Sequence, residues 1–270
     1  MADLPALFDL SGQTAVVTGG GGALGSVVAR GLANAGAAVV VVDLRPANAE
    51  QVADSITEAG GRAAGFGADL SSEAAVDEVF AQVDAAFGPV GILVNAISAP
   101  VDRYRAEEFP LDKWNQMLAV SLTSYFLCSR AAARRMIAAG RGGSIVNFAS
   151  IAGLSAVGRG NLAYSAAKGG VVQLTREHAY VCAPHGIRVN AVLPCQFVND
   201  WWAGQIDDPE HAALVARSVS GIPLGRMGSP PEIVGPVLFL ASAAASMVTG
   251  VMLPVDGGNL AMNAGASVDW

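Results

Sequence analysis

The 270-residue sequence predicts an α/β fold, a doubly wound parallel sheet of about seven strands with helices on both faces. Short β-rich runs alternate with longer helical patterns, which favours right-handed β-α-β crossovers. The apolar runs at 39–42 and 92–94 are continuous rather than alternating, as in strands covered on both faces. Hydrophobic residues make up 52% of the chain and charged residues 14%, with no break in composition, so we expect a single domain over residues 1–270.

The order of elements follows from the same patterns. Strands are expected at 14–19, 37–44, 63–70, 91–96, 143–150, 187–194 and 250–258, with helices at 23–35, between the second and third strands, and at 72–87. One uncharged run, 233–255, is long enough to be tested as a membrane span. It contains Gly235, Pro236 and a polar turn at 246–250, so we expect it to form a helix, a turn and a short strand.

Charge and cysteine content exclude several classes of partner. The net charge of −7 disfavours nucleic acid and anionic membranes, and no basic run reverses this. The first residues lack the pattern of a signal peptide. Three cysteines (Cys128, Cys182 and Cys195) form no C-x-x-C pair, and the three histidines have no metal-ligand spacing. We therefore expect a cytoplasmic protein without a bound metal.

The stretch TGGGGALG at 18–25 joins the first strand to the first helix. It fits G-x-G-x-x-G, and it also fits T-G-x-x-x-G-x-G with Ala23 at the middle glycine. A strand, a glycine loop and a helix N-terminus together suit a pyrophosphate. Asp43 ends the next strand, where a carboxylate accepts hydrogen bonds from an adenosine ribose and repels a 2′-phosphate. The pattern predicts a dinucleotide, with NAD favoured over NADP, although Arg45 weakens that preference.

The segment YSAAK at 164–168 places Tyr164 and Lys168 one helical turn apart on one face. An ammonium beside a phenol favours the phenolate, so Tyr164 can serve as a base towards an alcohol or as an acid towards a ketone. Ser150 lies at the end of an expected strand, the edge at which ligands bind in open α/β sheets. Ser150, Tyr164 and Lys168 are therefore the candidate catalytic residues.

These motifs resemble the short-chain dehydrogenase/reductase family nearly from end to end. The segments that carry the resemblance, besides the two above, are ADL at 68–70, LVN at 93–95, IRVNAVLP at 187–194, PLGRMGSPPEI at 223–233 and VTGVMLPVDGG at 248–258. The resemblance implies a Rossmann-like fold and the T-G-x-x-x-G-x-G reading of the loop. The cofactor residues it implies are Gly19, Gly22, Leu24, Gly25, Asp43, Asp69, Leu70, Asn95, Tyr164, Lys168, Pro194, Phe197 and Asn199.

The sequence also departs from the family pattern. The family's N-N-A-G is NAIS at 95–98, and the place of its catalytic asparagine, which positions a water in a proton relay, is taken by Ser121. The resemblance therefore implies a fourth catalytic position at Ser121, with a shorter side chain. A Pro-Gly pair is replaced by Pro194-Cys195, and a threonine that contacts the nicotinamide carboxamide is replaced by Asn199.

The resulting hypothesis is reversible, NAD-dependent oxidation of a secondary alcohol to a ketone on a polyol, sugar or other small hydroxy compound. Ser150 and Tyr164 would bind the substrate, and Trp201 and Trp202 would add contacts from a lid at about 196–221. The two tryptophans fit a subunit contact as an alternative. Arg103 and Arg105 could help to bind a polar or anionic substrate, although a solvated charged loop is the better explanation for them.

Two other functions stay open. A 3-oxoacyl thioester reductase that uses NADP is one, and a non-catalytic NAD-binding regulatory protein is the other. Family members often form tetramers through the helix that carries YSAAK and the long helix before it. Both helices are rich in small residues here, so we expect a homotetramer or homodimer.

Overall fold

The computed structural model describes residues 4–206 and 208–262, and its centre is one parallel sheet in the order β3-β2-β1-β4-β5-β6-β7. The strands are β1 (Thr14–Thr18), β2 (Ala38–Asp43), β3 (Ala63–Gly67), β4 (Ile92–Asn95), β5 (Gly143–Phe148), β6 (Ile187–Pro194) and β7 (Met252–Val255). The helices are α1 (Leu4–Phe8), α2 (Ala23–Asn34), α3 (Pro46–Glu58), α4 (Glu73–Phe87), α5 (Leu111–Leu118), α6 (Ser124–Ala139), α7 (Leu162–Cys182), α8 (Asp200–Ala203), α9 (Ala212–Val219) and α10 (Val234–Ala241). The predicted fold class is confirmed.

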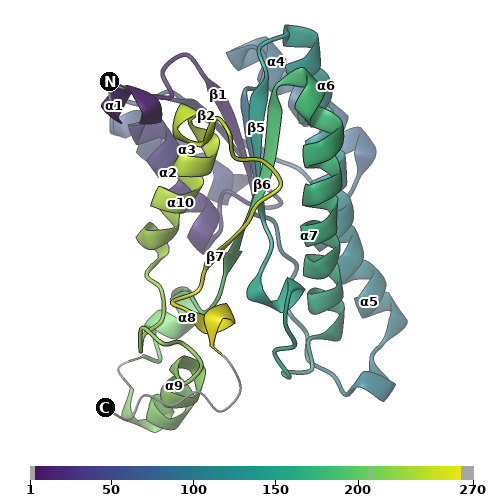
Figure 1. The fold of residues 1–270 in the computed structure, drawn as a ribbon, viewed down its shortest axis with the longest axis vertical. Helices are drawn as coiled ribbons and strands as arrows, with labels where there is room; N and C mark the ends of the chain where they lie inside the picture. Colours follow the sequence, from purple (N-terminus) through teal and green to yellow (C-terminus); the bar gives the residue numbers. More distant parts are fainter. Residues whose placement is uncertain (1–3, 207, 263–270) are drawn as a thin grey trace.

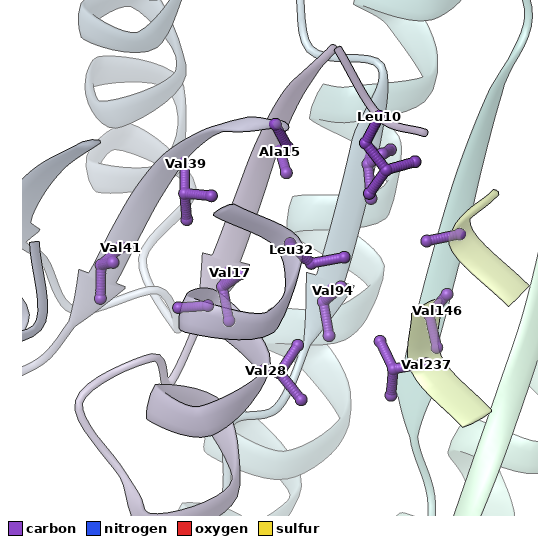
Figure 2. Close-up of a cluster of buried hydrophobic side chains, with 14 of the residues drawn as sticks. Leu10, Ala15, Val17, Val28, Leu32, Val39, Val41, Val94, Val146 and Val237 are labelled. Carbon is purple, nitrogen blue, oxygen red and sulfur yellow. The ribbon is translucent and has the colours of Figure 1, made fainter. Parts of the chain in front are cut away.

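The sheet is buried on both faces. Helices α2, α3 and α10 cover one face, and α4, α6 and α7 cover the other (Figure 1). Figure 2 shows Val17 and Val41 of two neighbouring strands and Val28 of α2, all of which belong to the apolar cluster on the first face. Val16 and Val40, one position away in the same strands, belong to the cluster on the second face. Because successive side chains of a strand alternate between faces, burial on both sides requires the continuous apolar runs seen in the sequence.

The strand order reverses beside β1, which pairs with β2 on one side and with β4 on the other. Ligands of open α/β sheets bind at such a point, beyond the carboxyl ends of the strands. A chain of buried side chains lies beneath it. Thr18 Oγ1 donates to Asn95 Oδ1 at 3.1 Å, Asn95 Nδ2 to Asn147 Oδ1 at 3.0 Å, and Asn147 Nδ2 to Thr175 Oγ1 at 3.0 Å. This chain joins β1, β4, β5 and α7 into a floor whose polar groups are paired.

The uncharged run 233–255 divides as predicted, into α10, a turn and β7. Within residues 4–206 and 208–262, no helix is long and apolar enough to cross a membrane. Between β6 and α10 the chain leaves the sheet and forms α8 and α9, which lie beyond the ends of the strands (Figure 1).

Candidate active site

A cavity of about 1160 Å³ lies at the carboxyl ends of the strands and gathers most of the predicted site residues. The predicted residues that line it are Gly19, Gly22, Leu24, Gly25, Asp43, Asp69, Leu70, Ser150, Tyr164, Lys168, Pro194, Phe197, Asn199 and Trp202. The volume exceeds that of an ordinary drug-sized pocket, which suits a dinucleotide together with a small substrate.

The backbone of the glycine loop distinguishes between the two sequence patterns that TGGGGALG fits. Gly19 has a φ of +66°, and a Cβ there would lie 2.7 Å from the carbonyl oxygen of Ala96. A Cβ on Gly25 would collide with the carbonyl oxygen of Gly19, whereas at Gly22 the nearest atom would be 3.4 Å away. Gly20 and Gly21 are crowded too, since a Cβ would lie 2.7 Å from Val41 Cγ1 and 2.6 Å from Asn48 Cβ, but within the loop only Gly19 has a positive φ. This requirement at Gly19 favours T-G-x-x-x-G-x-G, because the G-x-G-x-x-G reading does not include Gly19. The loop ends at the N-terminus of α2, where free backbone N–H groups favour an anion.

Acidic side chains lie beside the glycine loop at the same end of the cavity, above β2 and β3. Asp43 Oδ2 accepts a hydrogen bond from the Gly21 backbone N–H at 3.1 Å, and its Oδ1 accepts from the Arg45 N–H at 3.1 Å. Asp69 and the 71% exposed Leu44 line the same end. A carboxylate beside an exposed apolar side chain is the arrangement that fits a ribose and an adenine ring.

Ser150, Tyr164 and Lys168 lie together on the wall above β5. The Tyr164 side chain hydrogen-bonds with Ser150, and Lys168 Nζ lies 5.9 Å from the centroid of the Tyr164 ring. Burial raises the pKa of the Tyr164 phenol, and the Ser150 hydrogen bond opposes this rise. Burial lowers the pKa of the Lys168 ammonium from 10.5 to about 7. The site thus holds a phenol and an amine whose protonation the surroundings control, as acid-base chemistry requires.

Several predicted residues do not line this cavity. Ser121 is fully buried in a π-helical turn, Ala119–Thr123, where its Oγ accepts from the Ala99 backbone N–H at 3.1 Å and lies 3.3 Å from Met117 Sδ. Asn95 lies below the cavity, within the polar chain that joins the strands. The side chain of Trp201 lies outside the described part of the structure.

Sequence reasoning missed the side chain that contacts Lys168 most directly. Lys168 Nζ donates to the hydroxyl of Tyr125 at 3.0 Å and to the Phe148 carbonyl at 2.7 Å. Tyr125 lies on α6, and nothing in its local sequence distinguishes it from an apolar core residue. The arginines Arg103, Arg159 and Arg217 also line the cavity. Arg105 instead pairs with Glu107 at 3.0 Å.

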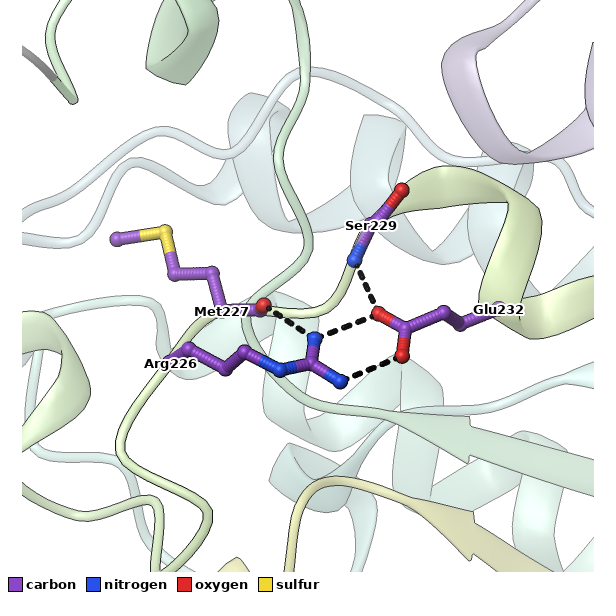
Figure 3. Close-up of polar contacts among 4 residues, drawn as sticks. All are labelled: Arg226, Met227, Ser229 and Glu232. Carbon is purple, nitrogen blue, oxygen red and sulfur yellow. Dashed lines mark hydrogen bonds and ion pairs between the residues drawn. The ribbon is translucent and has the colours of Figure 1, made fainter.

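The segment GRMGSPPEI secures the loop that carries Phe197 and Asn199. Arg226 donates to both carboxylate oxygens of Glu232, at 2.7 and 2.6 Å, and Glu232 accepts from the Ser229 backbone N–H at 2.7 Å (Figure 3). These contacts lower the pKa of the Glu232 carboxyl to about 2. Gly228 lies between Arg226 and Glu232 in the sequence. Its N–H donates to the Gln196 carbonyl, and its carbonyl accepts from the Val198 N–H, next to Phe197.

No group of three or more histidine, cysteine, aspartate or glutamate side chains within residues 4–206 and 208–262 is placed to hold a metal. The described cavity holds Ser150, Tyr164 and Lys168 at one end and the glycine loop with Asp43 and Asp69 at the other.

Comparison with known proteins agrees with this geometry. A family model described as enoyl-(acyl carrier protein) reductase matches residues 21–259. The chain belongs to the short-chain dehydrogenase/reductase family, and it is an oxidoreductase of the alcohol dehydrogenase or ketoreductase type.

Three relatives span nearly its whole length. It is 40% identical to cis-4-hydroxycyclohexanecarboxylate dehydrogenase of Sinomonas cyclohexanicum, over 93% of this chain and 97% of that protein. It is 38% identical to D-threitol dehydrogenase of Mycolicibacterium smegmatis, over 93% and 94%. A gluconate 5-dehydrogenase from Burkholderia cenocepacia, solved in complex with NADP and tartrate, superposes with a TM-score of 0.87 at 33% identity, covering 97% of this chain and 100% of that one.

Proposed function

We propose that this protein oxidises a secondary alcohol of a small hydroxy acid or polyol to the ketone, reversibly, with NAD as the preferred cofactor. The observation that carries this proposal is the meeting of Ser150, Tyr164 and Lys168 on one wall of the cavity, at the carboxyl end of β5. The glycine loop and Asp43 line the same cavity at the other end, so a bound dinucleotide would extend between the two groups.

Each residue of the wall has a distinct part in the proposed reaction. Ser150 donates a hydrogen bond to the substrate oxygen and stabilises the negative charge that develops there. Tyr164 takes the hydroxyl proton in oxidation and returns it in reduction. Lys168 favours the phenolate of Tyr164 by its charge and binds the ribose next to the nicotinamide. When bound, the cofactor accepts or supplies the hydride.

The remaining predicted residues would hold that cofactor. Gly19, Gly22, Leu24 and Gly25 would surround the pyrophosphate. Asp43 would bind the adenosine ribose, and Asp69 and Leu70 would contact the adenine. At the far end, Pro194, Phe197 and Asn199 would lie near the nicotinamide. The Asn199 side chain already accepts a hydrogen bond from the Trp202 backbone N–H at 3.0 Å, so its carboxamide oxygen is engaged before any ligand binds.

The preference for NAD rests on Asp43, whose carboxylate would repel a 2′-phosphate. Arg45 favours NADP, because an arginine can bind a 2′-phosphate, and the related gluconate 5-dehydrogenase was solved with NADP. The kinetic constants with each cofactor test the preference directly. We expect kcat/KM to be higher with NAD than with NADP. Asp43→Asn should lower the ratio of kcat/KM with NAD to kcat/KM with NADP by at least about tenfold, the effect of one unfavourable charge contact. Turnover with NADP alone would contradict the preference.

An anionic substrate is favoured by the charges at the catalytic end. Arg103, Arg159 and Arg217 line the cavity, Arg159 from the segment between Ser150 and Tyr164, and none of them forms an ion pair with a carboxylate of the described residues. The carboxylates among the lining residues, Asp43 and Asp69, belong to the opposite end. A substrate carboxylate would therefore meet only positive charge near the reacting hydroxyl.

The test of the reaction is cofactor reduction measured by absorbance over a panel of hydroxy acids, polyols, sugars and 3-hydroxyacyl thioesters. We expect Tyr164→Phe to lower kcat/KM by about a hundredfold or more, because it removes the proton-transferring hydroxyl. Tyr104→Phe, which alters a tyrosine that packs on Phe109 outside the cavity, is the matched control. Full turnover by Tyr164→Phe would refute the assignment.

The panel also separates the alternatives. Preference for a thioester with NADP would indicate the acyl reductase, and NAD binding without turnover on any compound would indicate a regulatory protein.

The anionic substrate is tested by a substitution at Arg159. Arg159→Gln should raise KM for hydroxy acids by about tenfold and leave KM for neutral polyols unchanged, whereas an equal effect on both would remove the argument for an anion. Arg176→Gln, on the exposed side of α7, is the control.

We further propose that residues 196–221 act as a lid, since Phe197, Trp202 and Arg217 line the cavity from that segment. A homotetramer or homodimer is supported by exposed apolar side chains on α6 and α7, among them Phe126, Tyr180 and Val181. A cytoplasmic location is supported by three cysteines that form no disulfide.

A further inference from the structure

Tyr125 of α6 is a fully buried tyrosine whose hydroxyl lies in the catalytic wall. Its Oη is 2.8 Å from the carbonyl oxygen of Ile97, 3.0 Å from that of Phe148 and 3.0 Å from Lys168 Nζ. A buried tyrosine needs at least one hydrogen-bond partner for its hydroxyl. At the rim of the cavity that partner could be water, but Tyr125 is fully buried and has protein partners. From α6, its hydroxyl contacts the loop after β4 through Ile97, the end of β5 through Phe148, and α7 through Lys168.

The capacity of each group decides how these contacts are shared. The hydroxyl has one proton, and the ammonium of Lys168 has three, while the two carbonyls only accept. Lys168 is 2.7 Å from the Phe148 carbonyl and 3.5 Å from that of Ile97, and Tyr125 is closer to Ile97 than to Phe148. The distances therefore assign the Tyr125 proton to Ile97 and leave its lone pair for Lys168.

This assignment uses two of the three Lys168 protons and leaves one. The Phe148 carbonyl and Tyr125 Oη hold the ammonium, and the Ile97 carbonyl is farther away at 3.5 Å, so we infer that the third N–H faces Tyr164, whose ring centroid is 5.9 Å from Nζ. Among the described residues, Tyr125 is the one whose side chain hydrogen-bonds Lys168.

The electrostatic surroundings make that contact important. Lys168 is 2% exposed, and no carboxylate of the described residues pairs with it. The ionisable side chains that face this cluster are Tyr125 and Cys128 from α6 and Tyr164 from α7. All three can only be neutral or negative, and burial raises the pKa of each above its usual value. Tyr125 thus stays a neutral phenol and serves as a dipole.

Ser121, which stands where the family resemblance implies a catalytic asparagine, does not supply this support. Its hydroxyl is engaged with the Ala99 backbone and Met117 and does not reach Lys168. Tyr125 lies four residues further along the same helical path, on the same face, and does reach it.

We propose that Tyr125 is the positioning residue of this active site: its hydroxyl accepts a hydrogen bond from Lys168, keeps that ammonium charged and directs its remaining N–H towards Tyr164. The kinetic part of this inference rests on the proposed function, whereas the effect on Lys168 does not. Tyr125 does not conduct protons, because its own proton is donated to a carbonyl, which cannot pass one on.

The test uses the ionisation of Lys168 itself. The chain has two lysines, Lys113 and Lys168, so selective ¹³C labelling of lysine gives two Cε signals, which Lys113→Met assigns. The pKa of Lys168 is then measured in the full-length protein and in Tyr125→Phe, which removes only the hydroxyl. We expect the pKa of Lys168 to fall by about one unit in Tyr125→Phe, the effect of losing one hydrogen bond to a charge. Tyr104→Phe should leave it unchanged.

Kinetics provide the second measurement. With less charge beside Tyr164, its phenolate forms at higher pH, so oxidation by Tyr125→Phe should be about tenfold slower at pH 7 and approach the wild-type rate in alkali. A decrease of the oxidation rate by the same factor at every pH would mean that only packing was damaged, and it would overturn the proposal. An unchanged Lys168 pKa in folded Tyr125→Phe would overturn it as well.

A second variant guards against misfolding. Replacement of Tyr125 by 4-fluorophenylalanine keeps the ring and a para substituent that is a much weaker acceptor than a hydroxyl, so the Lys168 pKa should fall by nearly as much as in Tyr125→Phe. No fall in this protein would contradict the inference. If Tyr164→Phe were to retain full turnover, the proposed reaction would fail, yet the Lys168 titration would still decide the role of Tyr125.

Discussion

The buried amine of Lys168 makes the stability of the cofactor-free protein depend on pH in a defined direction. Burial lowers the pKa of this group from 10.5 in an unfolded chain to about 7 in the fold. Between these values the unfolded chain binds a proton that the folded chain does not, so the free energy of unfolding rises as the pH rises. Below pH 7 both states are protonated, and the full cost of burying the charge remains.

The size of this effect follows from the two pKa values. Each unit of difference corresponds to about 1.4 kcal/mol, and integration from pH 7 to pH 9.5 gives a gain of about 3 kcal/mol. The window ends there because the pKa of Tyr164 is raised by burial, and its ionisation in the unfolded chain lowers stability above pH 10. Lys168→Met removes the titrating group and keeps an apolar stem of similar length.

The assay is urea unfolding at several pH values and one protein concentration, for wild type and Lys168→Met. Other titrating groups cancel in the difference between the two proteins, which should change by about 3 kcal/mol from pH 7 to pH 9.5 in favour of wild type. Lys113→Met is the matched control, since Lys113 is at the surface, 3.4 Å from Asp102. Parallel curves for wild type and Lys168→Met would refute the reasoning, because Lys168 would then titrate alike in both states.

Three further substitutions test the geometry of the cavity. Gly19→Ala should abolish cofactor binding in a fluorescence titration, because Gly19 has a φ of +66° and its Cβ would lie 2.7 Å from the Ala96 carbonyl oxygen, and unchanged affinity would contradict the assigned frame. Ser121→Ala should lower the free energy of unfolding by about 1–2 kcal/mol in urea, because the Ala99 N–H loses its buried partner; no loss would mean that this hydrogen bond is dispensable. Gly228→Ala, whose Cβ would lie 2.7 Å from the Phe197 ring, should raise KM for the cofactor at least several-fold, and an unaltered KM would separate Phe197 from cofactor binding.

The arrangement of strands could be predicted because buried parallel strands have a simple pattern. Each of the seven expected strands contains an observed one, and the largest differences occur at the ends, as at β7, which covers Met252–Val255 of the expected 250–258. The run 39–42 illustrates the reason: every side chain of it is fully buried, so each position requires an apolar residue. Ends depend on local hydrogen bonds that the apolar pattern does not encode.

The site was predictable only in part. Tyr164 and Lys168 share a helical turn, and Ser150 follows a strand of the same sheet, so spacing alone placed them together. The direction of Ser121 was not predictable, because one residue along a helix turns the side chain by about 100 degrees and a π-helical turn shifts it further. The contact between Tyr125 and Lys168 joins residues 43 positions apart in sequence, and it depends on how α6 packs against α7.

Two departures of this chain from its family pattern, Ser121 and the NAIS segment, meet at the loop that follows β4. Ser121 accepts from the Ala99 N–H, and Tyr125 donates to the Ile97 carbonyl, so two side chains of one helical face hold both ends of residues 97–99. The same loop carries NAIS in place of N-N-A-G. A glycine there would remove side-chain packing but keep the carbonyl at 97, which is the atom that Tyr125 needs. The contacts therefore form one series: Ser121 fixes the loop, the loop supplies the Ile97 carbonyl to Tyr125, and Tyr125 holds Lys168. Reverting a single member, such as Ser121→Asn, should consequently disturb the Lys168 pKa without touching Lys168.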